Sequence, residues 1–535
     1  MQRRTLVKAA GAVLATAAVA RPHVARSQAA RTLRFIPQID LTILDPVTTS
    51  AYIARNHGFA VYDTLFGQDS TFAPQPQMLA AVATESDGKL WRLTLRDGLR
   101  FHDGAPVLAR DCVASIRRWG RRDSFGQALM AATDDLQAAD DKTIVFRLKR
   151  PFPLLPAALG KVASNMCPMM PERLAMTDPF TTITEALGSG PFRYLPDERV
   201  PGARTVYARF EGYVPRPDGK PDWTAGPKIA HVDRVEWTVI PDASTAFAAL
   251  KSGQMDWWQE PALDLVPAMR KEPGIQVVDL DPTGAPAMMR FNHLQAPFNN
   301  PAIRRALLGA VNQAEFMEAV AGAERQLWKD GTGFFPTASP LASDTGMSAL
   351  KAPPGFAPDF AKVRTALAAA GYNNERTVVM VATDLPALAA LGQVGADMLT
   401  RAGMNVDIQA MDWGSVIQRR SSREPVEKGG WSVFFTSFFG LDQLTPAGHL
   451  GLRGNGTNGW FGWCESPKLE ALRDAWFAAP DLAAQKAVAV DIQQQAFIDV
   501  PYVPLGEYSI PTAIRREVTG LQKGIPLYWG LTKQA

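Results

Sequence analysis

Cysteine is scarce in this sequence, since its 535 residues include only Cys112, Cys167 and Cys464. Three cysteines are too few for a disulfide framework, and their spacing matches no metal-binding motif. One pair could bridge in an oxidising compartment, and the sequence leaves open whether any pair does. The fold must therefore rest on hydrophobic cores, and a chain of this length needs several of them or one large discontinuous core.

The common catalytic motifs are also missing. The sequence has no H-E-x-x-H, no G-x-S-x-G, no phosphate loop ending in G-K-[ST], and no G-x-G-x-x-G after a strand. His102 precedes Asp103 in an Asp-Gly turn, where the carboxylate is expected to bond the backbone. Gly188-Ser189-Gly190-Pro191 is interpreted as a break at a domain crossing rather than an anion cradle. We expect no enzymatic activity, no cofactor and no metal site.

An excess of basic charge is absent once the N-terminal segment is set aside. The whole chain carries 56 Lys and Arg against 53 Asp and Glu, but residues 1–29 hold five bases and no acid. The remainder has 51 bases and 53 acids, a net charge of −2. Nucleic-acid binding needs clustered Lys and Arg to displace counterions, so we expect no nucleic-acid partner.

Residues 1–29 have the features of an export signal: a basic start, a short apolar run over residues 9–20, and small residues before Ala30. The run Arg3-Arg4-Thr5-Leu6-Val7-Lys8 resembles the twin-arginine signal of bacteria, and an ordinary secretory signal would lead to the same compartment. Cleavage is predicted after Ala29, with the mature chain in the periplasm. No later run reaches the roughly 18 apolar residues of a membrane helix, so a soluble mature protein is expected.

Hydrophobic patterning predicts both antiparallel and parallel sheet. Residues 31–36 are expected to form a strand and residues 52–66 a helix. Alternation from Trp91 to Leu95, followed by Asp97-Gly98 and then Leu99 and Phe101, predicts a hairpin. Further on, residues 377–381, 386–401 and 406–410 form a strand-helix-strand pattern, which implies a parallel pair.

Aromatic residues are the most conspicuous candidates for a binding site. They gather at the edges of predicted elements, at positions 257–258, 334–335, 413, 431, 434–435, 438–439, 460, 461 and 463. Each one alone is more simply explained as core, because aromatic side chains bury large areas wherever they lie. Together they suit an apolar cleft with a few polar anchors, which is the usual form of a ligand site.

Several motifs occur along the chain in an order that resembles one protein family. The most specific is residues 90–118, LWRLTLRDGLRFHDGAPVLARDCVASIRR, preceded by residues 61–65, VYDTL. Others are Leu44-Asp45-Pro46, residues 188–192, the stretch from Arg290 to Ala306, the helix 362–371, and the aromatic-proline strand 501–505. Over residues 31–535 the chain resembles the large solute-binding proteins of bacterial ABC importers, the dipeptide, oligopeptide and nickel-chelate class.

The resemblance implies an α/β fold of the two-lobed periplasmic-binding-protein (Venus-flytrap) type with an additional inserted domain. Its implied divisions are lobe I over 30–75, 189–282 and 505–535, the inserted domain over 76–188, and lobe II over 283–504. Such proteins close about a hinge on a small-molecule or peptide-like ligand and deliver it to an inner-membrane ABC permease with its ATPase subunits. A monomer is expected.

The resemblance also suggests the residues of the ligand site. In peptide-binding members an Asp pairs with the peptide α-amino group, and placing that motif on residues 436–442 puts Phe439 there, with Asp442 at the second acidic position. Ordinary free-amino peptides are therefore unexpected ligands, because a buried ammonium would lack its partner. Arg453 is the predicted partner of a ligand carboxylate. The remaining predicted ligand-binding residues are Tyr52, Trp258, Phe334, Phe335 and Phe438.

Two alternatives stay open from the sequence. Some relatives bind metal chelates or haem, and His449, beside the aromatic segment, is the histidine that such a function would use. An exported hydrolase is the other alternative, and it would need a nucleophile and its base to meet in the cleft. Neither has a motif of its own in the chain.

Overall fold

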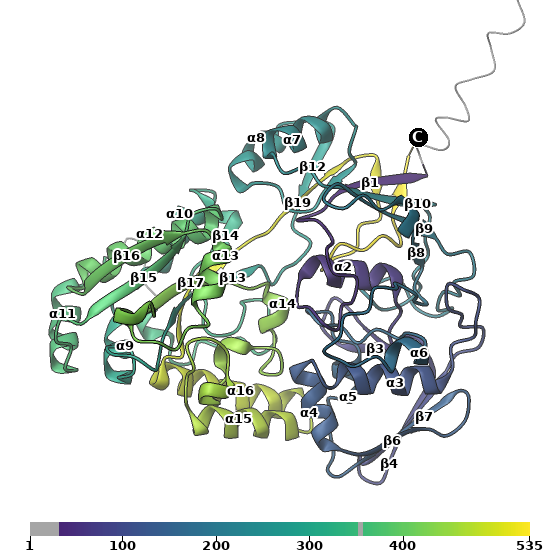
Figure 1. The fold of residues 1–535 in the computed structure, drawn as a ribbon, viewed down its shortest axis with the longest axis horizontal. Coiled ribbons are helices and arrows are strands. Elements are labelled where there is room, and N and C mark those ends of the chain that lie inside the picture. Colours follow the sequence, from purple (N-terminus) through teal and green to yellow (C-terminus); the bar gives the residue numbers. More distant parts are fainter. Residues whose placement is uncertain (1–30, 351–356, 535) are drawn as a thin grey trace, which may run out of the picture.

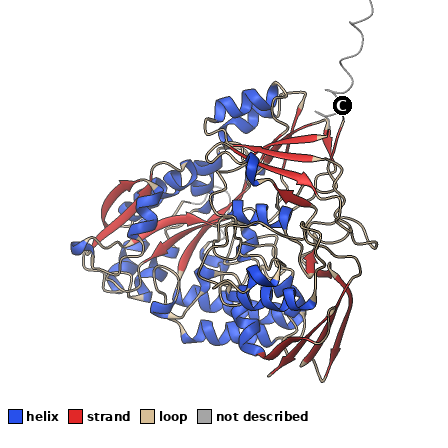
Figure 2. Cartoon of the chain, turned by 45° about the vertical axis from the view of Figure 1, so that its right-hand side comes forward, coloured by secondary structure: helices blue, strands red, loops and turns tan. Residues whose placement is uncertain are grey.

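The computed structural model describes residues 31–350 and 357–534; the predicted signal segment, with Arg3, Arg4 and the cleavage position at Ala29, lies outside the described residues. Three sheets of four or more strands lie in separate parts of the molecule (Figures 1 and 2). The fold is mixed α/β, as predicted. Among the described helices, none is both long enough and apolar enough to cross a membrane.

The first sheet has seven strands and collects the beginning, the middle and the end of the described chain. In spatial order its strands are β12 (Ile275–Val278), β19 (Thr512–Arg515), β11 (Trp257–Trp258), β1 (Thr32–Ile36), β10 (Arg234–Thr238), β9 (Arg204–Arg209) and β8 (Phe192–Tyr194). The predicted strand at residues 31–36 is thus confirmed. Helices α7 (Ala243–Lys251) and α8 (Val266–Met269) pack against its β11 and β12 end.

The second sheet has six strands from the C-terminal half. In spatial order these are β14 (Trp328–Lys329), β18 (Tyr502–Tyr508), β13 (Ala285–Phe291), β17 (Val433–Ser437), β15 (Arg376–Ala382) and β16 (Asn405–Met411). β15 and β16 pair in parallel and are joined by α12 (Pro386–Arg401), which confirms the predicted crossover unit. The other helices of this part are α9 (Pro301–Leu308), α10 (Gln313–Ala321), α11 (Phe360–Ala369), α13 (Trp413–Arg419), α14 (Gly440–Gln443), α15 (Pro467–Ala478) and α16 (Leu482–Asp499).

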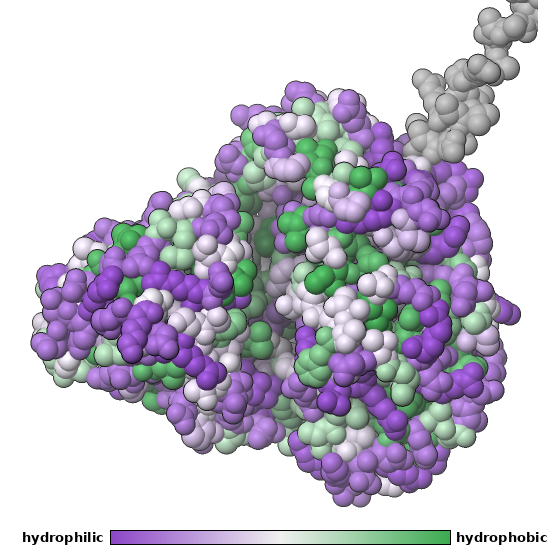
Figure 3. Space-filling model, in the orientation of Figure 1, coloured by the Kyte–Doolittle hydropathy of each residue, from purple (hydrophilic) through white to green (hydrophobic). Residues whose placement is uncertain are grey.

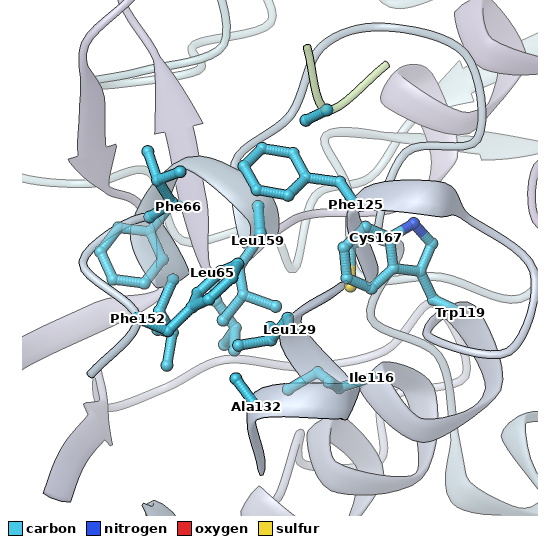
Figure 4. Close-up of a cluster of buried hydrophobic side chains, with 14 of the residues drawn as sticks. Leu65, Phe66, Ile116, Trp119, Phe125, Leu129, Ala132, Phe152, Leu159 and Cys167 are labelled. Atoms are coloured by element: carbon cyan, nitrogen blue, oxygen red, sulfur yellow. The ribbon is translucent and has the colours of Figure 1, made fainter. Parts of the chain in front are cut away.

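The third sheet is antiparallel, in the order β4 (Leu79–Glu85), β5 (Leu90–Leu95), β7 (Thr143–Leu148) and β6 (Thr133–Ala138). Helices α3 (Ala109–Trp119), α4 (Ser124–Ala132), α5 (Leu155–Leu159) and α6 (Glu172–Ala175) belong to the same part of the chain. Figure 4 shows their core, where Trp119, Phe125 and Phe152 converge with the aliphatic side chains around Leu129. The predicted hairpin at Asp97-Gly98 is wrong, because β5 pairs with β4 and with the distant β7 instead.

Helix α2 (Tyr52–Val61) lies beneath the first sheet and ends five residues before the predicted Phe66. Its last turn is closely approached by Gly188 and Gly190, where a Cβ atom would overlap the carbonyl oxygen of Val61. The two glycines therefore serve backbone packing. Two small sheets complete the described strands: β2 (Phe66–Gln68) with β3 (Pro74–Pro76), and β20 (Val518–Thr519) with β21 (Thr532–Lys533).

Two short segments join the seven-stranded sheet to the six-stranded sheet. Residues 279–284 connect β12 to β13, and residues 509–511 connect β18 to β19. We call these two segments the crossing segments. Because β18 continues to Tyr508 within the six-stranded sheet, the second crossing comes after residue 508, later than the expected change at 504–505.

Candidate ligand-binding cleft

A cavity of about 740 Å³ lies between the two halves that the crossing segments join. Figure 3 shows the molecule hollowed between its left-hand and right-hand parts, with apolar residues along the groove. We call this cavity the interlobe cleft. One wall comes from residues 38–39, 49–52, 122–124, 161, 164 and 165, and the other from residues 413 and 417 of α13 and residues 420, 436–438, 442, 443, 448, 450 and 460. Side chains from distant parts of the sequence thus enclose one space, which suits capture of a small ligand.

Tyr52 and Asp442 connect the two walls. The Tyr52 hydroxyl donates to the Asp442 carboxylate and accepts from the backbone N–H of Phe439 at 3.2 Å. The other Asp442 oxygen accepts from the N–H and Oγ of Ser164, at 3.0 and 2.8 Å. Burial, and next the charge of Asp442, raise the pKa of Tyr52 well above its ordinary value, so the phenol stays protonated and donates. Both oxygens of Asp442 are therefore occupied by the protein itself.

Phe439 is the residue that was predicted to replace the amine-pairing Asp of peptide-binding members. Its ring meets Tyr52 edge to face, with centroids 4.1 Å apart, and the buried guanidinium of Arg55 lies 5.6 Å from its centroid. A small cavity of about 30 Å³ beside it is also lined by Glu260 and Asp281. Burial raises the pKa of Glu260 to about 7 and that of Asp281 to about 6. Glu260 is therefore partly protonated near neutral pH, whereas Asp281 remains mostly ionised there.

Phe438 belongs to an aromatic wall of the cleft. Its ring packs edge to face on Trp460, with centroids 5.4 Å apart, and both residues line the cavity together with Trp413. The structure thus brings Tyr52, Phe438 and Asp442 of the predicted residues into the cleft. Phe439, also predicted, lines the small cavity beside Arg55 and not the interlobe cleft. Such a surface favours flat or apolar parts of a ligand.

Four predicted residues lie elsewhere. Trp258 is part of β11 and packs in a core cluster with Ile36 and Leu250. Phe334 and Phe335 are only 1% and 2% exposed and belong to the core, where Phe334 contacts Tyr502. These three aromatics follow the general rule that such side chains are buried as core.

Arg453 also lies outside the lining of the interlobe cleft. It forms an ion pair with Glu470 of α15, with Nε 3.0 Å from Oε1, and Nη2 donates to the second oxygen at 3.2 Å. The intramolecular carboxylate already fills the fork that a ligand was predicted to occupy. His449 is likewise buried, and its Nε2 lies 2.7 Å from the carbonyl oxygen of Phe334. Within residues 31–350 and 357–534, no group of three His, Cys, Asp or Glu side chains is arranged to hold a metal ion.

Several cleft residues had no specific signal in the sequence. Arg122 and Lys161 line one wall, and Arg420 lines the other beside Trp413 and Trp460. The two tryptophans were already candidates as members of the aromatic set. The basic residues resembled ordinary solvated charges, because their position depends on loops that only the tertiary fold brings together.

Comparison with known proteins agrees with this architecture. Residues 73–458 match the family model described as bacterial extracellular solute-binding proteins, family 5. A probable peptide ABC transporter periplasmic-binding protein of Sinorhizobium fredii is 38% identical over 540 residues, which cover 100% of this chain and 99% of that protein.

Two solved structures show the same fold. The periplasmic binding protein DppA of Helicobacter pylori, in complex with the peptide STSA, gives a TM-score of 0.76 at 20% identity, covering 96% of this chain and 100% of that one. The binding protein AgaA of A. tumefaciens R10, in complex with agropinic acid, gives 0.75 at 20% identity, covering 94% and 99%. These two proteins therefore share one fold and bind a peptide and a different kind of small solute.

Proposed function

The chain belongs to the family 5 extracellular solute-binding proteins, and from this premise we propose that it captures a peptide-like solute whose amino end is blocked or apolar. It is the substrate-binding component of an ABC importer, acts in the periplasm and has no enzymatic role. The observation that carries the proposal is the wall formed by Phe439, Tyr52 and Arg55, where an amine-pairing carboxylate would be needed.

The electrostatics of that wall support a ligand without a free ammonium group. Arg55 is buried and its Nη1 has no hydrogen-bond partner among the described residues, so it would repel a second cation. Asp442 is the carboxylate of α14, and both of its oxygens already accept hydrogen bonds, from Tyr52 and from Ser164. An ammonium bound here would exchange its hydration for an aromatic ring and a like charge, a loss of several kcal/mol.

We further propose that the domains follow the sheets. Lobe I would be built on the seven-stranded sheet, lobe II on the six-stranded sheet, and the inserted domain on the four-stranded sheet. The crossing segments would be the hinge, because they are the two short connections between the two larger sheets. Closing this hinge brings Tyr52 and Asp442 together. A monomer exported by the twin-arginine route, as Arg3-Arg4 suggests, completes the proposal.

A panel of dipeptides tests the ligand class. The melting temperature of the purified protein is measured during titration with matched free-amino and N-acetylated dipeptides. The acetylated dipeptides should raise the melting temperature and the free-amino dipeptides should leave it unchanged, because only the acetylated ones avoid an uncompensated ammonium. The variant Phe439→Asp restores a carboxylate at this wall and should gain a response to free-amino members. Sub-micromolar binding of free dipeptides to the unmodified protein would refute the proposal.

A further inference from the structure

A second cavity, of about 370 Å³, lies beside the four-stranded sheet, between α3, the edge strand β6 and the segment that begins with α6. Helices α3 and α6 lie side by side (Figure 1). We call this cavity the basic groove, because four arginines line it, Arg110, Arg117, Arg118 and Arg121, against one acid, Glu172. It shares no lining residue with the interlobe cleft.

Two of the four arginines have no internal counterion. Glu172 forms an ion pair with Arg110, and Arg118 is paired with a buried carboxylate outside the groove. Arg117 and Arg121 are exposed, and neither forms an ion pair with a described residue. Arg117 donates to a backbone carbonyl at 2.6 Å, which orients the side chain without neutralising it. The groove therefore carries a local excess of positive charge, although residues 30–535 as a whole are slightly acidic.

Apolar side chains accompany this charge. Val113, Leu136 and Ala175 are buried and line the groove between the arginines. Met176, also in the lining, and Phe180, just beyond it, are 72% and 63% exposed, more than any other large hydrophobic residue of the described chain. Uncompensated cations beside exposed apolar side chains are the combination that binds the interface of an anionic membrane.

The groove extends toward the rim of the interlobe cleft through Phe180 and Arg122. The guanidinium carbon of Arg122 lies 4.7 Å from the ring centroid of Phe180, and Arg122 itself lines the cleft. The acid of this loop, Asp178, accepts the backbone N–H of Phe180 at 2.8 Å. A protein that passes its solute to an inner-membrane permease must bring its cleft close to the bilayer. The surface beside the rim is then the one that meets the lipid.

We propose that the basic groove, with Met176 and Phe180, is a docking surface for a bilayer of anionic phospholipid. Arg117 and Arg121 bind headgroup phosphates, whose oxygens suit the guanidinium fork. Met176 and Phe180 enter the boundary between the headgroups and the acyl chains. Docking of this kind is weak and reversible, because few charges and only two apolar side chains contribute. It concerns a surface separate from the solute site and does not depend on which solute binds there.

Co-sedimentation of the purified protein with phospholipid vesicles measures the docking. Vesicles of equal parts phosphatidylglycerol and phosphatidylcholine should bind it on the order of 10-fold or more tighter than vesicles of phosphatidylcholine alone, and high salt should remove most of the difference. The double variant Arg117→Gln with Arg121→Gln should lose most of this preference. The double variant Met176→Ser with Phe180→Ser should bind the anionic vesicles about 10-fold more weakly.

Arg147→Gln with Arg150→Gln is the matched control, because both residues are exposed, form no ion pair with a described residue and lie outside the groove lining. It should bind vesicles as the unmodified protein does. Equal binding of anionic and neutral vesicles by the unmodified protein, or a preference that survives loss of Arg117 and Arg121, would overturn the proposal. Binding of inorganic phosphate without binding of vesicles would also overturn it, in favour of a site for a soluble anion.

The same variants separate this inference from the solute proposal. Their affinity for N-acetylated dipeptides should equal that of the unmodified protein, because the groove and the interlobe cleft share no lining residue. A loss of vesicle binding with unchanged dipeptide affinity supports the docking surface. A parallel loss of both in the Arg117 and Arg121 variant would contradict it, since the substitutions would then disturb the molecule as a whole.

Discussion

Replacement of Lys228 by Met is expected to lower the free energy of unfolding by about 3–5 kcal/mol, because it leaves a buried carboxylate without its counterion. Lys228 Nζ lies 2.7 Å from Asp63 Oδ1, and the two side chains are 0% and 1% exposed. The Tyr213 hydroxyl donates to the second Asp63 oxygen at 2.9 Å, which fixes the carboxylate in place. The charge of Asp63 then has no water to solvate it once the ammonium is removed.

Equilibrium unfolding in urea, followed by tryptophan fluorescence, measures this loss. Arg173→Met is the control, since Arg173 also forms an ion pair, a bidentate one with Glu185 at 2.7 and 2.5 Å, but both side chains are about half exposed. An exposed pair contributes about 0–1 kcal/mol. Similar losses in the two variants would show that burial does not decide the contribution of the Lys228 pair.

Replacement of Asp442 by Ala should favour the open form of the protein and weaken ligand binding by more than about 100-fold. The substitution removes three hydrogen bonds to a charged acceptor that join α14 to Tyr52 and to Ser164 on the opposite wall. Each such bond is worth about 1.5–3 kcal/mol, so a net loss of about 3 kcal/mol from the closed form is a conservative expectation. The lobes themselves should remain folded.

Affinity for N-acetylated dipeptides and the radius of gyration from solution X-ray scattering measure this effect together. Asp359→Ala is the control, because Asp359 also accepts a backbone N–H, that of Lys362 at 3.0 Å, but caps the exposed start of α11. It should leave affinity and radius unchanged. An Asp442→Ala protein that binds with unaltered affinity would exclude this contact from the closing mechanism.

The fold could be predicted where the local hydrophobic pattern and the observed strand pairing agree. The unit β15–α12–β16 is one example, because a crossover helix between two short apolar strands leaves few other arrangements. The Asp97-Gly98 turn is the opposite case. A hairpin was compatible with its local sequence, but β7, about 50 residues later, provides a better partner for β5. Such non-local pairing depends on tertiary packing, which a turn motif does not encode.

The site was predictable only where residue type and a family motif coincide. Tyr52, Phe438 and Asp442 line the interlobe cleft, and their binding of a ligand stays a prediction. Trp258, Phe334 and Phe335 have the same chemistry but are core, and sequence alone does not separate a buried ring from a ring that lines a cleft. The sequence likewise does not distinguish the environment of Arg453 from that of Arg420. They differ because α15 brings Glu470 to Arg453 and no comparable acid to Arg420.

The central claim is that two lobes close on a solute and transfer it unchanged. Its most direct test is X-ray scattering from protein that has been unfolded, dialysed and refolded to remove bound solute, recorded before and after addition of the N-acetylated dipeptide mixture. Closure predicts a smaller radius of gyration with the mixture and an unaltered mixture on recovery. Saturable binding with an identical scattering curve, or chemical conversion of the bound dipeptide, would contradict it.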